Sequence, residues 1–191
     1  MEENQTTSLN FSDDFYGYSS ATAREMSKPN VHIITSAALR VPAHSSASAS
    51  PVLENIIDKS RKHRSSERVI PILGVPYDAV VSFIHFLYSF RCSEEEMEKY
   101  GIHLLALSHV YSIPQLKQSC TKVLGDWLTM ENVVNVLQLA RMCDAPNLYR
   151  KCMKLVANNF KAVENTEGWK FLQDHEPWLE LDILHYYHIS L

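Results

Sequence analysis

The chain has 191 residues, of which 46% are hydrophobic and 21% charged, and its formal net charge is −4. This composition suits a globular protein of one large or two small domains, and the charge gives no reason to expect binding to nucleic acid phosphates. The polar, acidic start excludes a secretory signal, and no apolar run reaches the roughly 18 residues that a bilayer span needs, so we expect an intracellular protein with no membrane segment.

The first 43 residues contain a polar segment followed by two short strands. Residues 1–28 are rich in Ser, Thr, Asn and Asp without a helical or strand period, which predicts disorder. Val31–Thr35 is β-branched and predicts a strand, and Leu39–Pro42 predicts a second strand stopped by its proline. A tight turn at Ser36–Ala38 would join them as a hairpin.

A helix and a third strand are expected next. Ser50-Pro51 is typical of a helix start, with serine as the cap and proline in the first turn. The basic cluster from Lys59 to Arg68 favours a solvated loop, and a nuclear address is the second interpretation. Arg68–Leu73 predicts a third strand, whose proline indicates either a sheet edge or an early end of the strand.

Helical periodicity begins near Pro76. The first helix has apolar residues at i, i+3, i+4 and i+7, and Ser93 to Glu96 matches a capping box that marks the next helix start. Pro114 and Thr129 mark two further starts. The apolar stripes that follow these two starts are Leu116, Cys120, Val123, Leu124 and Trp127, and then Val133, Val136, Leu137 and Ala140; one more stripe comprises Leu148, Cys152, Leu155, Val156, Phe160 and Val163. Few strands followed by many helices predict an α+β, helix-dominated fold.

The helical half contains an internal repeat. Residues 104–108 resemble residues 136–140, 32 positions later, and at the same offset Pro114 matches Pro146. Leu116 with Leu148 and Cys120 with Cys152 are matched pairs as well. We interpret each copy as an αα-hairpin that buries its apolar face only by stacking on the other copy.

The sequence contains no recognisable catalytic or metal-binding constellation. The chain has five glycines and no phosphate-binding loop, and Leu179 stands where a zinc protease helix would need histidine. The four cysteines lack ligand spacing, so we expect no zinc and no cofactor; Cys120 and Cys152 are expected to act as small core residues. Asp174–Glu176 is interpreted as a polar loop. We therefore expect a protein that is not an enzyme.

Several strings resemble the BTB/POZ domain family. They are Val31–Ile33, Val41–His44, Ser50–Leu53, the helix end Phe86–Ser89, and Leu104–Tyr111 followed by Leu116 and Cys120. The resemblance implies a small sheet capped by helices over residues 29–128, and a BACK-like helical extension over 129–187 with a tail at 188–191. Residues 1–28 would form the disordered N-terminal segment.

Within that family, the strings Glu98–Tyr111, Val133–Pro146, Glu167–Phe171 and Leu179–Leu184 are similar to plant BTB-and-TAZ-domain proteins. The resemblance implies a homodimeric adaptor that recruits substrates to cullin-3 ubiquitin ligases, with bromodomain transcription regulators as further partners, in nucleus and cytoplasm. No zinc-binding TAZ domain and no calmodulin-binding region are expected in residues 1–191. Arg61-Lys62-His63 occupies the place of the hydrophobic-x-Glu motif found in many cullin-binding members.

The partner-binding residues expected from this resemblance lie at several points along both predicted domains. They are Arg61, Lys62, His63, Tyr88, Tyr111, Ile113, Val133 and Leu137. Two alternatives to the ligase adaptor stay open: a dimerising transcriptional co-regulator scaffold that recruits no ligase, and a truncated, inhibitory form.

Overall fold

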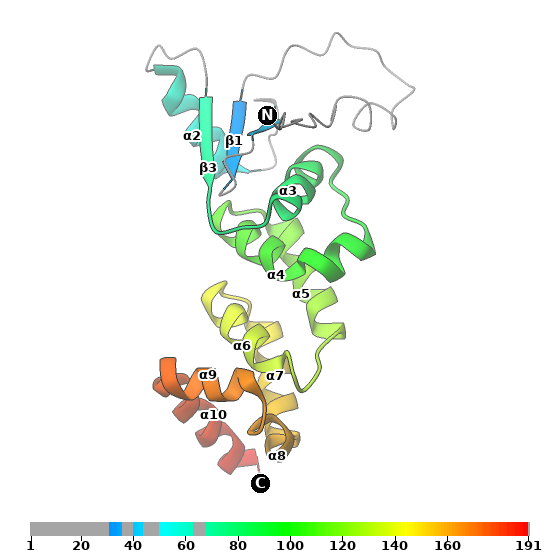
Figure 1. Ribbon diagram of the computed structural model, residues 1–191, viewed down its shortest axis with the longest axis vertical. Coiled ribbons are helices and arrows are strands. Elements are labelled where there is room, and N and C mark those ends of the chain that lie inside the picture. The colour runs from blue at the N-terminus through cyan, green and yellow to red at the C-terminus, as the bar shows by residue number, and fades with distance from the viewer. Residues whose placement is uncertain (1–30, 36–39, 44–49, 63–67, 191) are drawn as a thin grey trace, which may run out of the picture.

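The computed structural model describes residues 31–35, 40–43, 50–62 and 68–190. The described part is elongated, with a small sheet and one helix at one end and a succession of helices leading to the C-terminal end (Figure 1). The expected disorder of residues 1–28, the turn at Ser36–Ala38 and His63 lie outside the described residues.

Within the described ranges, the sheet has three strands in the order β2-β1-β3. Strand β1 (Val31–Thr35) pairs antiparallel with β2 (Arg40–Ala43) and parallel with β3 (Arg68–Ile72), which confirms the predicted hairpin and third strand. The prediction that proline stops β2 is wrong, because Pro42 pairs with His32 and the strand continues to Ala43. β2 and β3 are the two edge strands, where a proline breaks no interior ladder.

Helix α2 (Pro51–Lys62) lies beside the sheet and packs on β3 (Figure 1). Ser50 caps it as predicted, because the Leu53 backbone N–H donates to Ser50 Oγ at 3.1 Å. The prediction that the basic cluster from Lys59 onward is a loop is wrong for Arg61 and Lys62, which belong to the last turn of α2.

Helices α3 (Tyr77–Ser89) and α4 (Glu94–Val110) follow, and the apolar stripe predicted for α3 is buried. The capping box is confirmed: the Glu96 N–H donates to Ser93 Oγ at 3.1 Å, and the Ser93 N–H donates to Glu96 Oε2 at 2.8 Å. The Tyr100 hydroxyl donates to Asp78 Oδ2 at 2.9 Å and connects α4 to α3.

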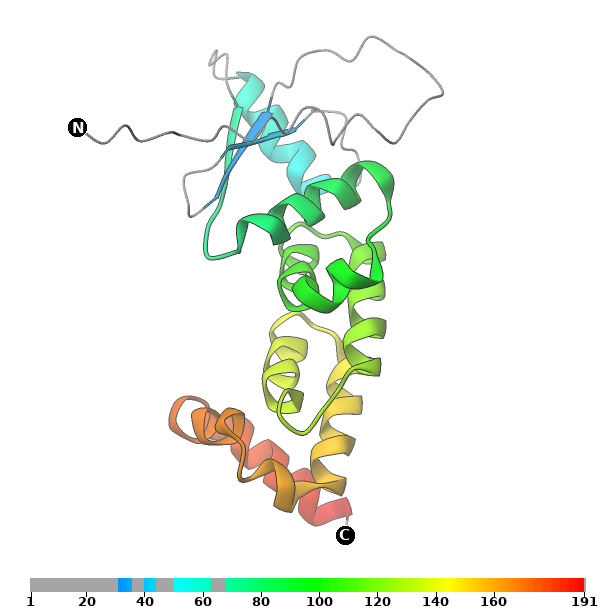
Figure 2. The ribbon, with the colours of Figure 1, turned by 45° about the vertical axis from the view of Figure 1, so that its right-hand side comes forward.

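The predicted pair of helical hairpins is present. Helices α4 and α5 (Pro114–Asp126) form the first, and α6 (Val133–Met142) and α7 (Pro146–Asn158) form the second. Figure 2 shows α5 and α7 following one another along one side of the molecule, and α4 and α6 stacked beside them. Leu116, Cys120, Leu148 and Cys152 are all buried, as the repeat predicts.

The two hairpins turn in the same way, residue for residue. Ser112 (φ 53°) and Asp144 (φ 49°) occupy the left-handed region 32 positions apart. The N–H of the following residue, Ile113 or Ala145, donates 2.8 Å to the carbonyl oxygen five residues earlier, on Ser108 or Ala140. This is the hydrogen-bond pattern of a Schellman motif, which ends a helix by satisfying its last carbonyls.

Two predicted helix limits in this region are wrong. Trp127 follows the end of α5 and is exposed, so it does not belong to the buried stripe. Thr129 does not start α6, which begins at Val133 with Asn132 as its cap. Thr129 and Asn132 instead exchange hydrogen bonds of 2.8 and 3.3 Å that hold the turn before the helix.

The predicted last stripe is broken into two helices at Asn159. Asn159 leaves helical geometry (φ −131°), and its side-chain amide donates to the Leu155 carbonyl at 3.0 Å; α8 (Phe160–Val163) follows. Such side-chain bonds to the backbone compete with helix continuation.

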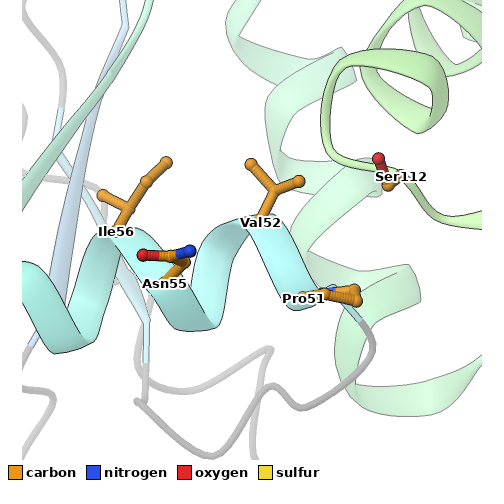
Figure 3. Close-up of a pocket in the computed structure, with 5 residues that line it drawn as sticks. All are labelled: Pro51, Val52, Asn55, Ile56 and Ser112. Carbon is orange, nitrogen blue, oxygen red and sulfur yellow. The ribbon is translucent and has the colours of Figure 1, made fainter.

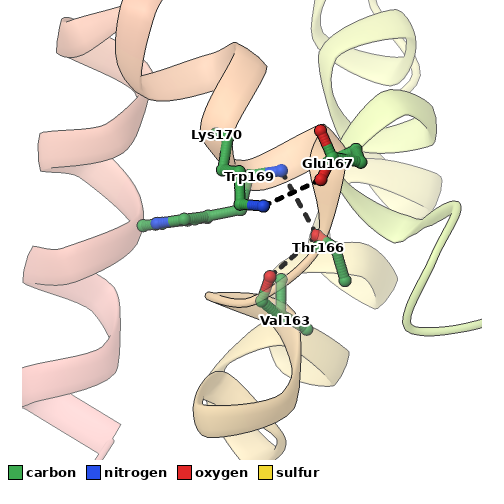
Figure 4. A network of polar contacts seen from close by, with 5 residues as sticks. All are labelled: Val163, Thr166, Glu167, Trp169 and Lys170. Carbon is green, nitrogen blue, oxygen red and sulfur yellow. Dashed lines mark hydrogen bonds and ion pairs between the residues drawn. The ribbon is translucent and has the colours of Figure 1, made fainter.

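Helices α9 (Glu167–His175) and α10 (Pro177–Ser190) complete the described fold. Figure 4 shows how α9 starts: the Thr166 hydroxyl donates to the Val163 carbonyl at 2.7 Å and accepts the Trp169 N–H at 3.2 Å, which caps the helix. The predicted polar loop is wrong for Asp174 and His175, which form the last turn of α9.

One continuous buried core extends from Ile33 in the sheet to Ile183 in α10. The described strands end at Ile72, and helices dominate the rest of the described chain, which confirms the α+β, helix-dominated fold. In the part of the chain that the structure describes, none of the helices has the length and apolar character to cross a membrane.

Candidate functional site

The N-terminus of α2 is attached to the turn between α4 and α5. The buried Ser50 hydroxyl donates to the Tyr111 carbonyl while its oxygen accepts the Leu53 N–H. One serine thus caps α2 and satisfies a backbone carbonyl 61 residues away. This contact fixes the position of α2 against the first helical hairpin.

Tyr111 and Ile113 support the turn from the core side. Tyr111 is 7% exposed and its ring lies 5.4 Å from that of Phe83, while Ile113 is 1% exposed. Burial raises the pKa of the Tyr111 phenol above its ordinary value, so this side chain stays neutral. Between them, Ser112 points outward in its left-handed conformation.

A shallow pocket of about 350 Å³ lies between α2 and this turn. Its lining residues are Pro51, Val52, Asn55, Ile56 and Ser112 (Figure 3). Val52 and Ile56 are half-buried and stand one helical turn apart on α2, with Ser112 opposite them. None of the five side chains is ionisable, so the pocket offers apolar contact with two polar groups at its rim, a chemistry suited to docking a partner side chain.

The structure separates the predicted partner-binding residues into three groups. Arg61 and Lys62 lie in the last turn of α2, and His63 is outside the described residues. Tyr88 is half-buried near the end of α3.

The other four predicted residues are in the core. Tyr111 and Ile113 lie behind the pocket, whereas Val133 and Leu137, both 0% exposed, lie on the inner face of α6. Since these side chains present almost no surface, the structure does not support them as direct contacts; Tyr111 and Ile113 position the pocket instead.

Sequence reasoning missed the pocket residues Val52, Asn55, Ile56 and Ser112. From the sequence, Val52, Leu53, Ile56 and Ile57 are only the apolar positions of this helix, with no site assigned to them. A signal was present, because four apolar positions at 52, 53, 56 and 57 make a face wider than a small sheet covers. Leu53 takes the buried position (3% exposed) and leaves Val52 and Ile56 at the edge.

The cysteines are structural. Cys120 and Cys152 are fully buried, as predicted, and burial raises the pKa of both thiols to about 12. Burial, together with the Glu96 carboxylate, raises the pKa of Cys92 to about 12 as well. These thiols therefore stay protonated at neutral pH and are poor nucleophiles and poor metal ligands.

Among the described residues, no group of three or more His, Cys, Asp or Glu side chains could hold a metal ion. The expectation that the chain binds no zinc stays a prediction.

The sequence was compared with known proteins. Residues 27–127 match the BTB/POZ domain family. BTB/POZ and TAZ domain-containing protein 1 of Arabidopsis thaliana is 61% identical over 166 residues, which cover 85% of this chain and 46% of that protein. Protein 2 of the same name and organism is 60% identical over 162 residues, covering 82% and 44%. Kelch-like protein 22 of Ailuropoda melanoleuca is 29% identical over 112 residues, covering 58% of this chain and 17% of that protein.

The chain thus spans less than half the length of the two A. thaliana relatives. The similarity extends past the BTB/POZ match into the helical region, because 166 aligned residues exceed the segment 27–127. This agrees with the resemblance to BTB-and-TAZ proteins on both halves of the chain.

Proposed function

The chain belongs to the BTB/POZ domain family, and from this we propose that it is the substrate-recruiting adaptor of a cullin-3 RING ubiquitin ligase. Membership makes it a protein-interaction module of the adaptor type. The observation that carries the finer proposal is the pocket between α2 and the α4–α5 turn, whose lining combines three apolar residues with two uncharged polar ones. A surface of this kind favours partner binding over chemistry.

In this proposal the cullin inserts an apolar side chain between Val52 and Ile56 of α2, and Asn55 and Ser112 contribute polar contacts at the rim. The basic end of α2, with Arg61 and Lys62, continues from the same helix and would meet acidic groups of the partner. Apolar anchors at the centre with polar groups at the rim are the usual anatomy of a protein interface.

The A. thaliana relatives are named for a TAZ domain as well as a BTB/POZ domain. By analogy we propose that this module works beside a TAZ domain, in ubiquitination and transcription-linked signalling in nucleus and cytoplasm. The cullin then binds one end of the molecule, and client recruitment uses other surfaces.

A pull-down with the purified N-terminal region of cullin-3 tests the proposal. We expect the wild-type chain to bind and Asn55→Arg to lose at least about tenfold in affinity, because a charged side chain would fill the pocket from an exposed position without disturbing the core. Ile102→Glu, an equally simple change at an exposed apolar residue of α4, is the matched control and should bind as wild type.

The two variants separate the outcomes. If Asn55→Arg binds like wild type, the pocket is not the cullin site. If the wild-type chain fails to bind cullin-3 at tens of micromolar, the ligase proposal is wrong and the co-regulator scaffold takes its place.

A further inference from the structure

Helix α10 is apolar on two opposite faces. Its inner face contains Leu179 and Ile183, which are 0% and 1% exposed. The opposite face contains Trp178, Leu181 and Ile189, which are 77%, 56% and 70% exposed, together with the exposed His185. Positions 178, 181, 185 and 189 recur every three to four residues and therefore form one line, called here the outer stripe of α10. The exposed Asp182 and His188 flank this stripe, and exposed apolar side chains rimmed by polar residues are typical of interaction sites.

Contacts between aromatic rings fix how α10 is rotated about its own axis. The helix therefore cannot turn to bury the outer stripe in place of the inner face. The Phe160 ring stacks on Tyr187 of α10 at 4.7 Å and meets the Trp169 ring of α9 edge-on at 5.2 Å. Figure 4 shows the Trp169 side chain extending from α9 toward α10. α10 also packs on α7. The outer stripe therefore faces away from the described fold.

The position of α10 in the stack explains why this exposure is unusual. The hairpin α4–α5 packs on α6–α7, and α6–α7 in turn packs on α9 and α10 (Figure 2). In such stacks each layer buries a face against the next, and a terminal layer normally has a polar outer face. Here α10 presents a tryptophan, a leucine and an isoleucine instead.

We propose that the outer stripe of α10 is the docking surface for the TAZ-containing part of BTB/POZ-and-TAZ proteins. In the two A. thaliana relatives, 46% and 44% of the length corresponds to this chain, so more than half of each protein lies outside the match. That remaining part supplies a covering body of sufficient size. A second copy of this chain is the weaker occupant, because three exposed apolar side chains fall far short of the roughly 800 Å² per partner that a stable interface between separate chains buries. A part of the same chain docks intramolecularly and needs less contact area.

The inference rests on the proposed pairing with a TAZ domain and is independent of cullin-3 binding. We would fuse the complete 191-residue chain to the part of A. thaliana protein 1 that lies outside the match, and compare it with the unfused chain by hydroxyl-radical footprinting read by mass spectrometry. The three tryptophans serve as built-in probes: Trp178 reports the stripe, the 40% exposed Trp127 reports a distant surface, and the 3% exposed Trp169 reports the core.

We expect oxidation of Trp178 to fall at least about fivefold in the fusion while oxidation of Trp127 and Trp169 stays unchanged, since full burial removes a side chain from solvent. Leu181→Glu in the fusion should restore Trp178 oxidation, and Ile102→Glu should not. Equal Trp178 oxidation in both proteins overturns the proposal. Protection of Trp178 in the unfused chain that grows with concentration also overturns it, in favour of a second copy. Neither result bears on the cullin-3 pull-down.

Discussion

At the scale of single residues, the contact between the two helical hairpins depends on a small residue facing a large one. A Cβ atom placed on Gly125 of α5 would lie 3.6 Å from Leu148 Cδ1 and 3.4 Å from the Lys151 side chain of α7. Lys151 Nζ in turn lies 3.1 Å from Asp126 Oδ1. That ion pair is exposed and contributes little, so the apolar contact of Leu148 holds the layers together.

Replacing Leu148, which is 2% exposed, with Ala should reduce the free energy of unfolding by about 2–5 kcal/mol, because a cavity replaces close-packed side-chain atoms. Denaturant unfolding followed by circular dichroism measures this loss. Leu181→Ala is the control at a 56% exposed leucine and should change stability by less than about 0.5 kcal/mol. Equal midpoints for the two variants would contradict the assigned packing.

At the scale of elements, the repeated Schellman turns show that the 32-residue duplication includes backbone geometry as well as apolar pattern. The left-handed positions contain Ser112 and Asp144 in place of the glycine that such turns favour. An L-residue there is strained by roughly 1–2 kcal/mol, and glycine relieves the strain at some cost in unfolded-state entropy.

Ser112→Gly should therefore raise the free energy of unfolding by up to about 1 kcal/mol. The same substitution at Ser119, in the interior of α5, should lower it by roughly 0.5–1 kcal/mol, because glycine costs entropy in a helix. Thermal melts of the two variants beside wild type test the opposite signs. A loss of stability in Ser112→Gly as large as that in Ser119→Gly would show that the turn is unstrained.

At the scale of the whole molecule, the core decides which apolar side chains stay exposed for contact with a second copy. From the sequence alone, Val31, Ile33, Leu53 and Ile56 predict more apolar surface than so short a sheet can bury, which favours a dimer. Ile33 and Leu53 are 2% and 3% exposed, so the chain itself covers them, and that part of the argument is wrong. Strand β3 favours a dimer for another reason: it is an edge strand among the described residues, and such an edge can pair by backbone hydrogen bonds with a second copy. Val69 in it and Leu73 just after it, 41% and 66% exposed, would add apolar contacts to that pairing.

We expect the wild-type chain to sediment as a dimer of 21.9-kDa subunits at tens of micromolar, a range that exceeds ordinary dimer dissociation constants by roughly tenfold or more. The double variant Val69→Glu, Leu73→Glu should sediment as a monomer, because charge would replace the apolar edge. Leu181→Glu, on the far helix α10, should remain dimeric. A monomeric wild type removes the homodimer from the proposal.

Local signals in the sequence determined where most elements start and what they are. The Ser50 cap, the Ser93–Glu96 capping box and the prolines at 114 and 146 act within a few residues, and each marks a helix start in the structure. Residues that share a helix face, such as Leu116 with Cys120, follow from the 3.6-residue period alone. The fold class, the duplication and the family resemblance therefore came from the sequence.

Tertiary structure alone decided which apolar faces are covered. The 3.6-residue helical period shows that Val52 and Ile56 share a face of α2. The neighbouring elements cover that face only partly, and the uncovered part is the pocket. The same neighbours bury Tyr111, Ile113, Val133 and Leu137, which the sequence suggested as contacts, and leave the outer stripe of α10 exposed. Burial depends on contacts between residues that lie far apart in the chain, such as the 61-residue separation of Ser50 and Tyr111. A local sequence pattern does not specify such contacts. The hydrophobic effect is non-directional, so any surface that removes an apolar side chain from water stabilises the fold to a similar degree.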